Sequence, residues 1–470
     1  MKIKNICCIG AGYVGGPTMA VIALKCPQIR INVVDTNSKK IRDWNNKDLK
    51  KLPVFEPGLS KIIAKTRNKN LFFSTKVGEA INAADMIFMA VNTPTKTSGK
   101  GKGMAADLTF VEKCATQIAK FSVSDKIVVE KSTLPVRTAE KIKKVLSSKN
   151  NKVQFEVISN PEFLAEGTAI NDLFKSDRVL IGGDDTKSGK EAVEKLAEIY
   201  EKWIPKNKIL RTNVWSSELS KLVSNAMLAQ RISSINSVSA LCEKTEANIE
   251  EVSKAVGMDS RIGPAFLKSS IGFGGSCFKK DILNLVYISR QYGLYEVADF
   301  WENVTKINSY QTFRFGEKII NKIKSSKGDQ IVTILGWAFK KNTNDSRESA
   351  SIYLTNQLLD QEIKIKIYDP MVQKERILED LKLQLENSGK SNKEIKNLVS
   401  QITICKDAYI ALKNSNLAAI CTEWDEFKNY DWKKIYDNMK NNAWVFDGRN
   451  LLNRHKLKTI GFNTFFLGQI

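Results

Sequence analysis

Histidine is almost absent from this 470-residue chain, which contains only His455, near its C-terminus. A Ser-His-Asp triad or a metal site built from several histidines is therefore nearly excluded. The eight cysteines include no Cys-x-x-Cys pair, so neither a zinc ribbon nor a thioredoxin-type redox site is expected. We expect no metal, and the chemistry must come from Cys, Lys, Asp, Glu or a bound cofactor.

The chain also lacks long apolar segments. No run reaches the roughly 18 apolar residues that are needed to span a membrane. The first ten residues, MKIKNICCIG, lack the apolar stretch and the cleavage site of a signal peptide. We therefore expect a cytoplasmic protein with no membrane partner and with reduced cysteines.

Acidic residues are outnumbered, since 73 Lys and Arg stand against 51 Asp and Glu, a net charge of +22. Such an excess would suit an anionic partner, for example a nucleotide, a nucleic acid or a membrane surface. The basic residues are scattered rather than gathered in one tail, and Lys, Asn and Ile are all abundant. A compositional bias explains the charge better, so no nucleic-acid partner is expected.

Length and hydrophobic periodicity divide the chain into three parts. Residues 1–212 alternate strand-like and helix-like runs, which predicts an α/β domain with a parallel, doubly wound sheet. Residues 213–325 show apolar spacings of three and four, which predict a helical connector with a long central helix. Residues 326–470 return to alternation and predict a second α/β domain.

A glycine-rich turn follows the first strand-like run. GAGYVG places Gly10, Gly12 and Gly15 before a helix-like run. Asp35, 20 residues after Gly15, ends the next strand. Such glycines let the backbone approach a pyrophosphate, while the acidic residue binds ribose hydroxyls and repels a 2′-phosphate. The pattern predicts NAD rather than NADP as cofactor. A nucleotide-type fold with an empty site is the alternative.

A second glycine-rich motif, GFGGSCFKKD, contains an isolated cysteine. With Ser276 as N-cap, Cys277 would be the first residue of a helix, where the dipole, Lys279 and Lys280 would lower its thiol pKa. Asp281, four residues on, would share its helix face. The motif predicts a nucleophile, and the alternative is a structural cysteine beside solvated charges.

Further polar groups occur in the predicted connector helix and at strand ends. Lys221 and Asn225 are one helical turn apart, and Glu162 and Glu166 in NPEFLAEGTAI follow a strand, where α/β sites lie. Taken alone, the first pair fits an exposed helix face better, and the second fits acidic first-turn residues equally well. The strand-end loops VNTPT and KSTLPVR are rich in hydroxyls.

Together, these motifs resemble the UDP-glucose 6-dehydrogenases of the UDP-glucose/GDP-mannose dehydrogenase family, especially the animal enzymes. The similar segments cover nearly the whole chain in order, and include GAGYVGGPT, EKSTLPVR, SNPEFLAEGTAI, GFGGSCFKKD and LGWAFKKNTNDSRES. The resemblance implies an α/β fold of two Rossmann-like doubly wound domains joined by a long helical connector. It implies oxidation of UDP-glucose to UDP-glucuronate by two NAD, with NAD bound by residues 1–212 and UDP-sugar by 326–470. The connector would form dimers within a homo-oligomer, which is hexameric in the animal branch.

The resemblance also implies residue roles. Cys277 would form a thiohemiacetal and then a thioester, Lys221 and Asn225 would stabilise the oxyanion, and Asp281 would hold the water network. Glu162 would be the base for thioester hydrolysis, and Thr133 a further polar member of the site. The implied NAD positions are Gly10, Gly12, Tyr13, Val14, Gly15, Asp35, Lys40, Val91, Asn92, Thr93, Pro94, Thr95, Ser132, Thr133, Glu166, Cys277 and Arg347. The implied substrate positions are Glu162, Phe163, Leu164, Ala165, Glu166, Lys221, Asn225, Arg261, Phe266, Lys268, Ser269, Ser270, Ile271, Gly272, Phe273, Gly274, Phe339, Lys340 and Arg449, with Arg261 reaching the neighbouring subunit's substrate.

Two alternatives remain at this point. A sister enzyme acting on GDP-mannose or a UDP-N-acetylhexosamine would share the Cys, Lys and Asp set, so only contacts to the sugar and base would discriminate. A non-catalytic protein that binds NAD or nucleic acid is favoured only by the net charge. Lys40 and Trp337 stand where the animal enzymes usually have Arg and Phe, which affects affinity rather than reaction type.

Overall fold

The computed structural model describes residues 2–149, 152–324 and 330–469. Its internal contacts divide the chain into two units. The first unit comprises Met1–Ser224 and Leu283–Gly293, and the second comprises Asn225–Ile282 and Leu294–Ile470. The predicted division into three domains stays a prediction.

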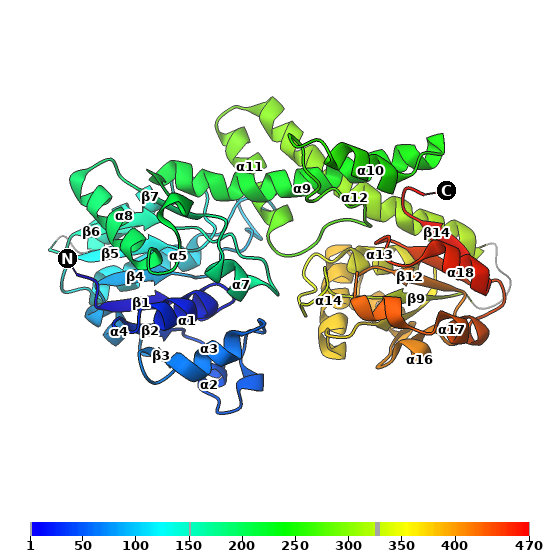
Figure 1. Ribbon diagram of the computed structural model, residues 1–470, viewed down its shortest axis with the longest axis horizontal. Helices are drawn as coiled ribbons and strands as arrows, with labels where there is room; N and C mark the ends of the chain where they lie inside the picture. Colours follow the sequence, from blue (N-terminus) through cyan, green and yellow to red (C-terminus); the bar gives the residue numbers. More distant parts are fainter. Residues whose placement is uncertain (1, 150–151, 325–329, 470) are drawn as a thin grey trace. The chain divides into compact units, whose positions relative to one another are not determined.

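The first unit contains an eight-stranded sheet in the order β3-β2-β1-β4-β5-β6-β7-β8 (Figure 1). The order of its first six strands, 3-2-1-4-5-6, is that of Rossmann folds. Its elements are β1 (Asn5–Ile9), α1 (Gly15–Lys25), β2 (Arg30–Val34), α2 (Ser38–Trp44), α3 (Leu59–Thr66), β3 (Leu71–Ser74), α4 (Val77–Ala83), β4 (Met86–Met89), α5 (Thr109–Phe121), β5 (Lys126–Glu130), α6 (Thr138–Lys149), β6 (Phe155–Ser159), α7 (Ala169–Phe174), β7 (Val179–Gly183), α8 (Lys187–Tyr200) and β8 (Ile209–Asn213).

The predicted strand–helix alternation is confirmed, with one difference in direction. β7 pairs antiparallel with β6 through Ser159 and Gly182, and β8 then runs parallel to β7. The expected all-parallel sheet therefore ends in two reversed strands. β8 was not predicted from the sequence, because it lies directly before a long helix and three of its five residues are exposed.

Both faces of this sheet are buried, which explains the near-continuous apolar strands. Ile6 and Cys8 belong to the apolar cluster on one face, and Cys7 and Ile9 belong to the cluster on the other. Cys7 and Cys8 thus alternate across the sheet as small buried side chains. Both side chains are fully buried, as structural cysteines are.

Four helices stand in the chain between the last strand of the first sheet, β8, and the first strand of the second sheet, β9. They are α9 (Val214–Thr245), α10 (Ile249–Gly257), α11 (Phe278–Gln291) and α12 (Tyr295–Lys324). With 32 residues, α9 is the long central helix that the spacing predicts. The unit boundary falls inside it, between Ser224 and Asn225.

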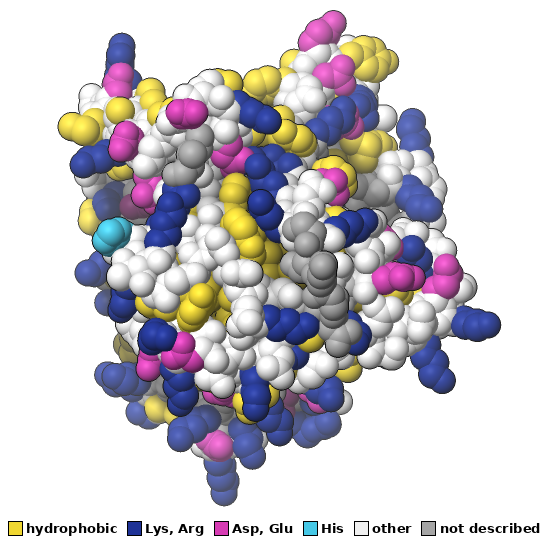
Figure 2. All heavy atoms as spheres, turned by 90° about the vertical axis from the view of Figure 1, so that its right-hand side faces the viewer, with side chains coloured by type: hydrophobic (Ala, Val, Ile, Leu, Met, Phe, Trp, Pro, Cys, Tyr) yellow, Lys and Arg dark blue, Asp and Glu magenta, His cyan; other side chains and the backbone are white. Residues whose placement is uncertain are grey.

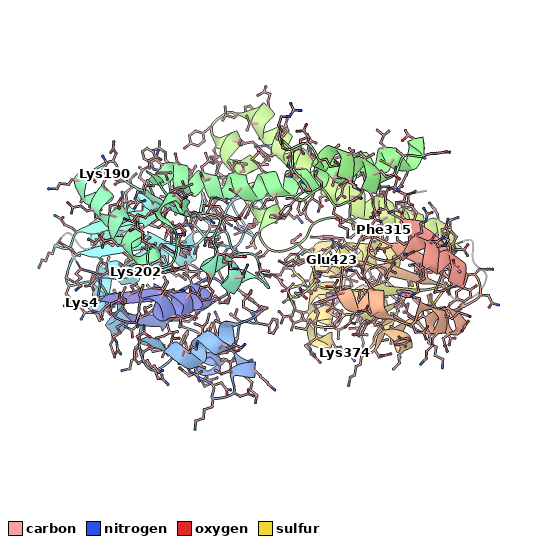
Figure 3. All side chains as sticks on the ribbon, viewed as in Figure 1. Lys4, Lys190, Lys202, Phe315, Lys374 and Glu423 are labelled. Atoms are coloured by element: carbon pink, nitrogen blue, oxygen red, sulfur yellow. The ribbon has the colours of Figure 1, made fainter. Side chains whose placement is uncertain are left out.

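The second unit has a six-stranded parallel sheet in the order β11-β10-β9-β12-β13-β14, again the Rossmann order. Phe315 of α12 lies within its apolar core (Figure 3). β11 and β14 are edge strands and were missed in the sequence. Its elements are β9 (Ile331–Leu335), α13 (Ala350–Leu359), β10 (Lys364–Tyr368), α14 (Lys374–Asn387), α15 (Asn392–Ser400), β11 (Ile402–Ile404), α16 (Ala408–Leu412), β12 (Leu417–Ile420), α17 (Trp432–Asn438), β13 (Trp444–Asp447), α18 (Arg454–Ile460) and β14 (Asn463–Phe466).

Charged side chains of both signs lie on the face drawn in Figure 2. Figure 2 shows Lys and Arg spread over one face and interspersed with Asp and Glu. Within the described residues, no helix is both long and apolar enough for a membrane span. The same part of the chain has no group of three or more His, Cys, Asp or Glu that could hold a metal ion.

Candidate active site

The glycine loop between β1 and α1 leaves room for a ligand. Gly10 has φ of +111°, and a Cβ there would come within 2.2 Å of the Ala90 carbonyl oxygen. A Cβ at Gly15 would lie 2.0 Å from the Gly10 oxygen, whereas one at Gly12 would meet no atom within 4 Å. The loop therefore packs tightly against neighbouring backbone at Gly10 and Gly15. At Gly12 it leaves open space, next to the N-terminus of α1. This arrangement suits a pyrophosphate.

Asp35 lies beside this loop, directly after β2. Its Oδ2 accepts hydrogen bonds from the Ala11 amide (3.1 Å) and from Lys40 Nζ (2.9 Å), and its Oδ1 accepts from the Asn37 amide (2.9 Å). Burial raises the pKa of Asp35, but these hydrogen bonds outweigh burial and hold the pKa below its ordinary value. Asp35 is therefore a carboxylate at neutral pH, as binding of ribose hydroxyls requires.

The charge of Asp35 leads to a prediction about cofactor preference. In wild type we expect NAD to be strongly preferred, and Asp35→Asn should lower the NAD/NADP ratio of kcat/KM about 30-fold, since removing carboxylate–phosphate repulsion gains roughly 2 kcal/mol. Steady-state kinetics with both cofactors measures this ratio. Glu79→Gln, at the exposed Lys76 pair on α4, is the matched control and should leave the ratio unchanged. A wild-type ratio near one would mean that Lys39 and Lys40 shield the 2′-phosphate.

Hydrogen bonds join the loops after β4 and β5. Thr93 Oγ1 donates to the Thr133 carbonyl (3.1 Å), and Ser132 Oγ donates to the Val91 carbonyl (2.6 Å). β1 and β4 are adjacent although far apart in sequence, so these loops lie at the point where the strand order reverses. Cofactors bind at this position in Rossmann folds. The hydroxyl-rich motifs VNTPT and KSTLPVR are therefore joined side by side, and they form one wall of the candidate cofactor site.

A charged cluster in the first unit contacts the KSTLPVR loop through Thr133. Lys221 Nζ is 3.7 Å from Glu162 Oε1, and both side chains are almost fully buried. Thr133 Oγ1 lies 3.5 Å from the same oxygen, at the limit of a hydrogen bond. Lys221 also lies over the Phe163 ring, 5.3 Å from its centroid. The structure thus brings together residues of three separate motifs, namely KSTLPVR, NPEFLAEGTAI and the helix that carries Lys221.

Lys131 is a buried neighbour of this cluster that the sequence analysis missed. Its Nζ donates to Asn160 Oδ1 (3.2 Å), which also accepts from the Tyr200 hydroxyl (2.8 Å). Burial lowers the pKa of Lys131 to about 8, although Glu162 acts in the opposite direction. The sequence did hold a signal for Lys131, because this lysine directly follows the apolar strand KIVVE, at a strand end where α/β sites lie. The motif KSTLPVR was interpreted only through its hydroxyl groups.

The cysteine motif lies in the second unit and differs slightly from the expected helix start. α11 begins at Phe278, so Cys277 immediately precedes the helix, and its carbonyl accepts from the Asp281 amide (2.9 Å). Cys277 is exposed. The two adjacent lysines direct their charges to carboxylates, since Lys279 Nζ bonds Glu348 and Lys280 Nζ bonds Asp281. The predicted effect of these lysines on the thiol stays a prediction.

Asp281 is fully buried and links Asn225 to this motif. Asn225 Nδ2 donates to Asp281 Oδ2 (2.6 Å), and Lys280 Nζ donates to Oδ1 (2.7 Å). Both carboxylate oxygens therefore have a donor. Asn225 is one turn from Lys221 on α9, but the two residues fall on opposite sides of the unit boundary.

The predicted substrate loop, residues 266–274, is held by the second unit. Its backbone amides at Ser270, Ile271 and Phe273 donate to Asn236 Oδ1 (2.9 Å), the Gly448 carbonyl (2.7 Å) and Asn308 Oδ1 (2.8 Å). The loop has no regular secondary structure, so these bonds fix its path.

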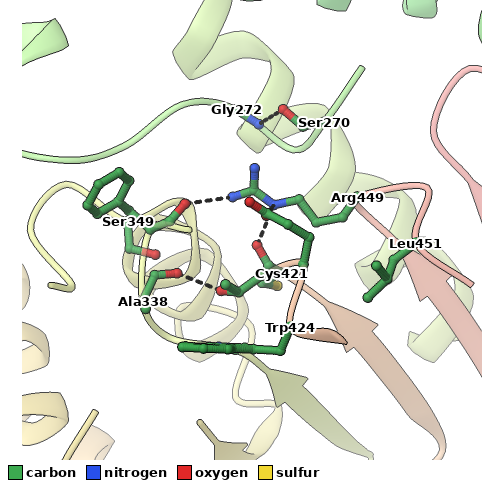
Figure 4. A network of polar contacts seen from close by, with 12 residues as sticks. Ser270, Gly272, Ala338, Ser349, Cys421, Trp424, Arg449 and Leu451 are labelled. Atoms are coloured by element: carbon green, nitrogen blue, oxygen red, sulfur yellow. Dashed lines mark hydrogen bonds and ion pairs between the residues drawn. The ribbon is translucent and has the colours of Figure 1, made fainter. Parts of the chain in front are cut away.

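Arg449 lies beside β12 and β13 and is nearly buried. Its Nε donates to the Cys421 carbonyl (2.7 Å) and its Nη2 to the Phe339 carbonyl (3.2 Å), while Glu423 lies 3.3 Å from Nε (Figure 4). Lys340 Nζ lies 5.6 Å from the Phe339 ring centroid. These predicted substrate residues are therefore neighbours in the fold.

Arg347 and Arg261 are both bonded to an acidic residue two positions earlier. Arg347 bonds Asp345, and Arg261 bonds Asp259 (both 2.6 Å from Nη2). The Arg261 side chain is 87% exposed. The predicted site residues thus form two groups, one in each unit.

Comparisons with known proteins identify the family. Models of the UDP-glucose/GDP-mannose dehydrogenase family match at the NAD binding domain (residues 4–204), the central domain (215–310) and the UDP binding domain (333–454). UDP-glucose 6-dehydrogenase of Drosophila melanogaster is 54% identical over 466 residues, covering 99% of this chain and 96% of the relative. UDP-glucose 6-dehydrogenase 2 of Arabidopsis thaliana is 53% identical over 468 residues, covering 99% and 97%. The similarity to animal enzymes is confirmed and extends equally to plant enzymes.

A solved structure agrees with the sequence comparisons. The UDP-glucose dehydrogenase from the hyperthermophilic archaeon Pyrobaculum islandicum superposes with a TM-score of 0.83 at 28% identity, covering 100% of this chain and 98% of that one. The predicted two-domain Rossmann-like fold is thereby confirmed. The chain belongs to the UDP-glucose/GDP-mannose dehydrogenase family and carries its NAD-binding and UDP-binding domains.

Proposed function

We propose that the chain oxidises UDP-glucose to UDP-glucuronate, consuming two NAD per turnover. The observation that carries the proposal is the state of the cysteines: of the eight, all within described residues, only Cys277 is exposed. It lies at the start of a helix whose buried Asp281 bonds Asn225. Relatives called UDP-glucose 6-dehydrogenase that are 52–54% identical over nearly the full chain support the substrate.

The residues of the first unit fit NAD. The open face of Gly12 and the N-terminus of α1 would receive the pyrophosphate, and the carboxylate of Asp35 would accept from the ribose hydroxyls. The wall formed by the VNTPT and KSTLPVR loops would hold the nicotinamide half. When bound, NAD supplies the hydride acceptor for both oxidations.

The remaining steps can be assigned to side chains. After the first oxidation the Cys277 sulfur bonds to the aldehyde carbon as its S–H bond and the carbonyl π bond break. The thiol proton ends on the oxygen of the resulting thiohemiacetal, and Lys221 and Asn225 stabilise that oxygen. The second oxidation converts this adduct into a thioester. Glu162 accepts a proton from the attacking water, and as the C–S bond breaks the sulfur takes a proton and the carboxylate product leaves. Asp281 orients Asn225 and Lys280 throughout.

The direct test is NADH formation by the purified protein with a panel of nucleotide sugars. We expect two NADH per UDP-glucose consumed and no free aldehyde, because the adduct to Cys277 retains the intermediate. Activity on GDP-mannose or a UDP-N-acetylhexosamine instead would identify a sister enzyme. No NADH from any of these sugars, with NAD still bound, would support a non-catalytic protein. A ratio of one, or accumulating aldehyde, would contradict the covalent route.

We also propose three functional parts, residues 1–212, 213–325 and 326–470, for NAD binding, dimerisation and UDP-sugar binding. The connector carries several exposed apolar side chains, among them Leu241, Met258, Phe300 and Phe313. Such a surface is typical of a subunit interface and supports a dimer-based homo-oligomer. The eight free cysteines support a reducing, cytoplasmic location.

Arg261 provides a test of the oligomer. If its exposed guanidinium reaches the neighbouring subunit's substrate, Arg261→Ala should weaken UDP-glucose binding about tenfold or more and leave NAD binding unchanged. Calorimetric titration with each ligand measures both. Mixed oligomers of Arg261→Ala and Cys277→Ser chains should regain activity, because some sites pair an intact cysteine with an intact neighbouring arginine. Verified subunit exchange without recovered activity would place Arg261 in its own subunit's site or in none.

A further inference from the structure

Lys279, two residues after Cys277, connects the cysteine segment to a distant loop. Its Nζ donates to Glu348 Oε2 (2.8 Å) and to the Tyr353 hydroxyl oxygen (3.1 Å). The Tyr353 hydroxyl donates to the same Glu348 oxygen. An ammonium, a carboxylate and a phenol therefore close a three-membered ring of contacts, in which the partners of Lys279 are 69 and 74 residues away in sequence.

The two backbones are also in direct contact beside this cluster. The Gly275 amide donates to the Arg347 carbonyl (2.8 Å). A Cβ on Gly274 would lie 2.5 Å from the Glu348 carbonyl oxygen, so only glycine permits this approach. The segment that carries Cys277 thus rests on residues 347–348 through main chain as well as side chains.

The loop of residues 343–349 is anchored on its other side too. Ser346 Oγ donates to Asp380, which also accepts from Trp337 Nε1 (3.1 Å) and pairs with Arg376 (2.7 Å). Glu348 has φ of +53°, which is uncommon for a residue other than glycine. Strained backbone of this kind persists only where surrounding contacts determine it.

Lys279 and Tyr353 keep their protonation states near neutral pH. Burial lowers the pKa of Lys279, but Glu348 and Tyr353 more than offset burial, so its net pKa lies above the ordinary value. Burial and the Glu348 charge raise the pKa of Tyr353 to about 12. Lys279 therefore stays an ammonium and Tyr353 a phenol at neutral pH.

We propose that Lys279, Glu348 and Tyr353, here called the tether, are positioning residues that fix the Cys277 segment against the 343–349 loop. The inference rests on the proposed role of Cys277 as nucleophile. The tether acts by fixing where the Cys277 sulfur and Arg347 lie. The hydrogen bond from the Gly275 amide to the Arg347 carbonyl joins the two segments that carry them. Its loss should therefore slow the chemical steps more than it weakens binding of either ligand.

Two variants and a matched control test the tether by kinetics. Lys279→Met and Glu348→Gln should each lower kcat about fivefold, with KM for UDP-glucose and NAD changed less than about twofold. Lys390→Met removes a pair of the same length, Lys390–Asp360 (2.8 Å), with similar exposure on the same unit, and should change neither constant. Lys279→Arg keeps the charge and should retain most of the activity. The double variant Lys279→Glu/Glu348→Lys restores a pair of opposite charges, so its kcat should be higher than that of either single charge reversal.

A second readout is independent of activity. Hydrogen exchange of a peptide covering residues 272–280, and alkylation of Cys277 by iodoacetamide, should both be about fivefold faster in Lys279→Met and Glu348→Gln than in wild type or Lys390→Met. Tyr353→Phe, which keeps the ion pair, should show a smaller increase and serves if either charged variant fails to fold. Wild-type kcat and wild-type exchange in these variants would refute the tether while leaving UDP-glucose oxidation intact. If wild type forms no NADH, the proposed function fails, and exchange and alkylation still decide whether the tether exists.

Discussion

Replacing Cys277 by serine is expected to abolish sustained NADH production from UDP-glucose, with kcat lowered at least about 10⁴-fold. The serine hydroxyl is a weak nucleophile at neutral pH without an adjacent base, and a sugar ester formed on it would hydrolyse far more slowly than a thioester. Binding of UDP-glucose should be nearly unchanged, because the substitution exchanges one atom at an exposed position. Steady-state kinetics and calorimetric titration measure the two effects.

Cys405→Ser is the matched control for this variant. Cys405 is the other cysteine that is not fully buried, and it lies beyond β11 in the second unit. We expect it to keep wild-type kcat. Substantial turnover by Cys277→Ser, with two NADH per sugar, would show that the intermediate is held by something other than the sulfur.

Asp281→Asn is the second change with a large expected effect, and kcat should fall about 10³-fold. The buried carboxylate accepts from Asn225 with one oxygen and from Lys280 with the other. The side-chain amide of asparagine has only one accepting oxygen, so one of these two bonds is lost. Asn225 then loses the bond that orients it toward the developing oxyanion. The free energy of unfolding should also fall by about 2 kcal/mol, because Lys280 loses a buried partner.

Asp425→Asn distinguishes the site from a general effect of removing a carboxylate. Asp425 also pairs with two lysines, Lys341 (2.6 Å) and Lys428 (2.8 Å), but at the surface. Surface pairs contribute little, so both kcat and thermal stability should remain near wild type. A wild-type kcat for Asp281→Asn would remove Asp281 from the proposed site.

The features predictable from sequence are those set by local spacing. The glycine loop, Asp35 and the long helix at Val214 follow from the order and period of neighbouring residues, and each lies where expected. The start of α11 was misplaced by one residue because Ser276 is also a plausible N-cap. The reversed direction of β7 and β8 could not be predicted, since strand direction depends on the path of the connecting loops and not on side-chain alternation.

The partners of the charged residues were the least predictable part of the candidate site. Sequence proximity suggested that Lys279 and Lys280 act on the sulfur, but Lys279 bonds Glu348, 69 residues away. Lys131 lies near Glu162 only because β5 and β6 are paired. Such contacts are set by tertiary structure, so no local pattern contains them, and the assigned catalytic roles stay predictions until the variants are measured.

α9 has a mechanical consequence for the proposed oxyanion pair. Its 32 residues, Val214–Thr245, include neither glycine nor proline, the residues at which helices commonly kink. Lys221 and Asn225 are therefore carried by a stiff rod roughly 48 Å long, at 1.5 Å rise per residue. Their separation along the helix is fixed by a single turn of regular backbone. Inserting a single alanine between them would rotate one side chain by about 100° relative to the other without changing any residue of the site.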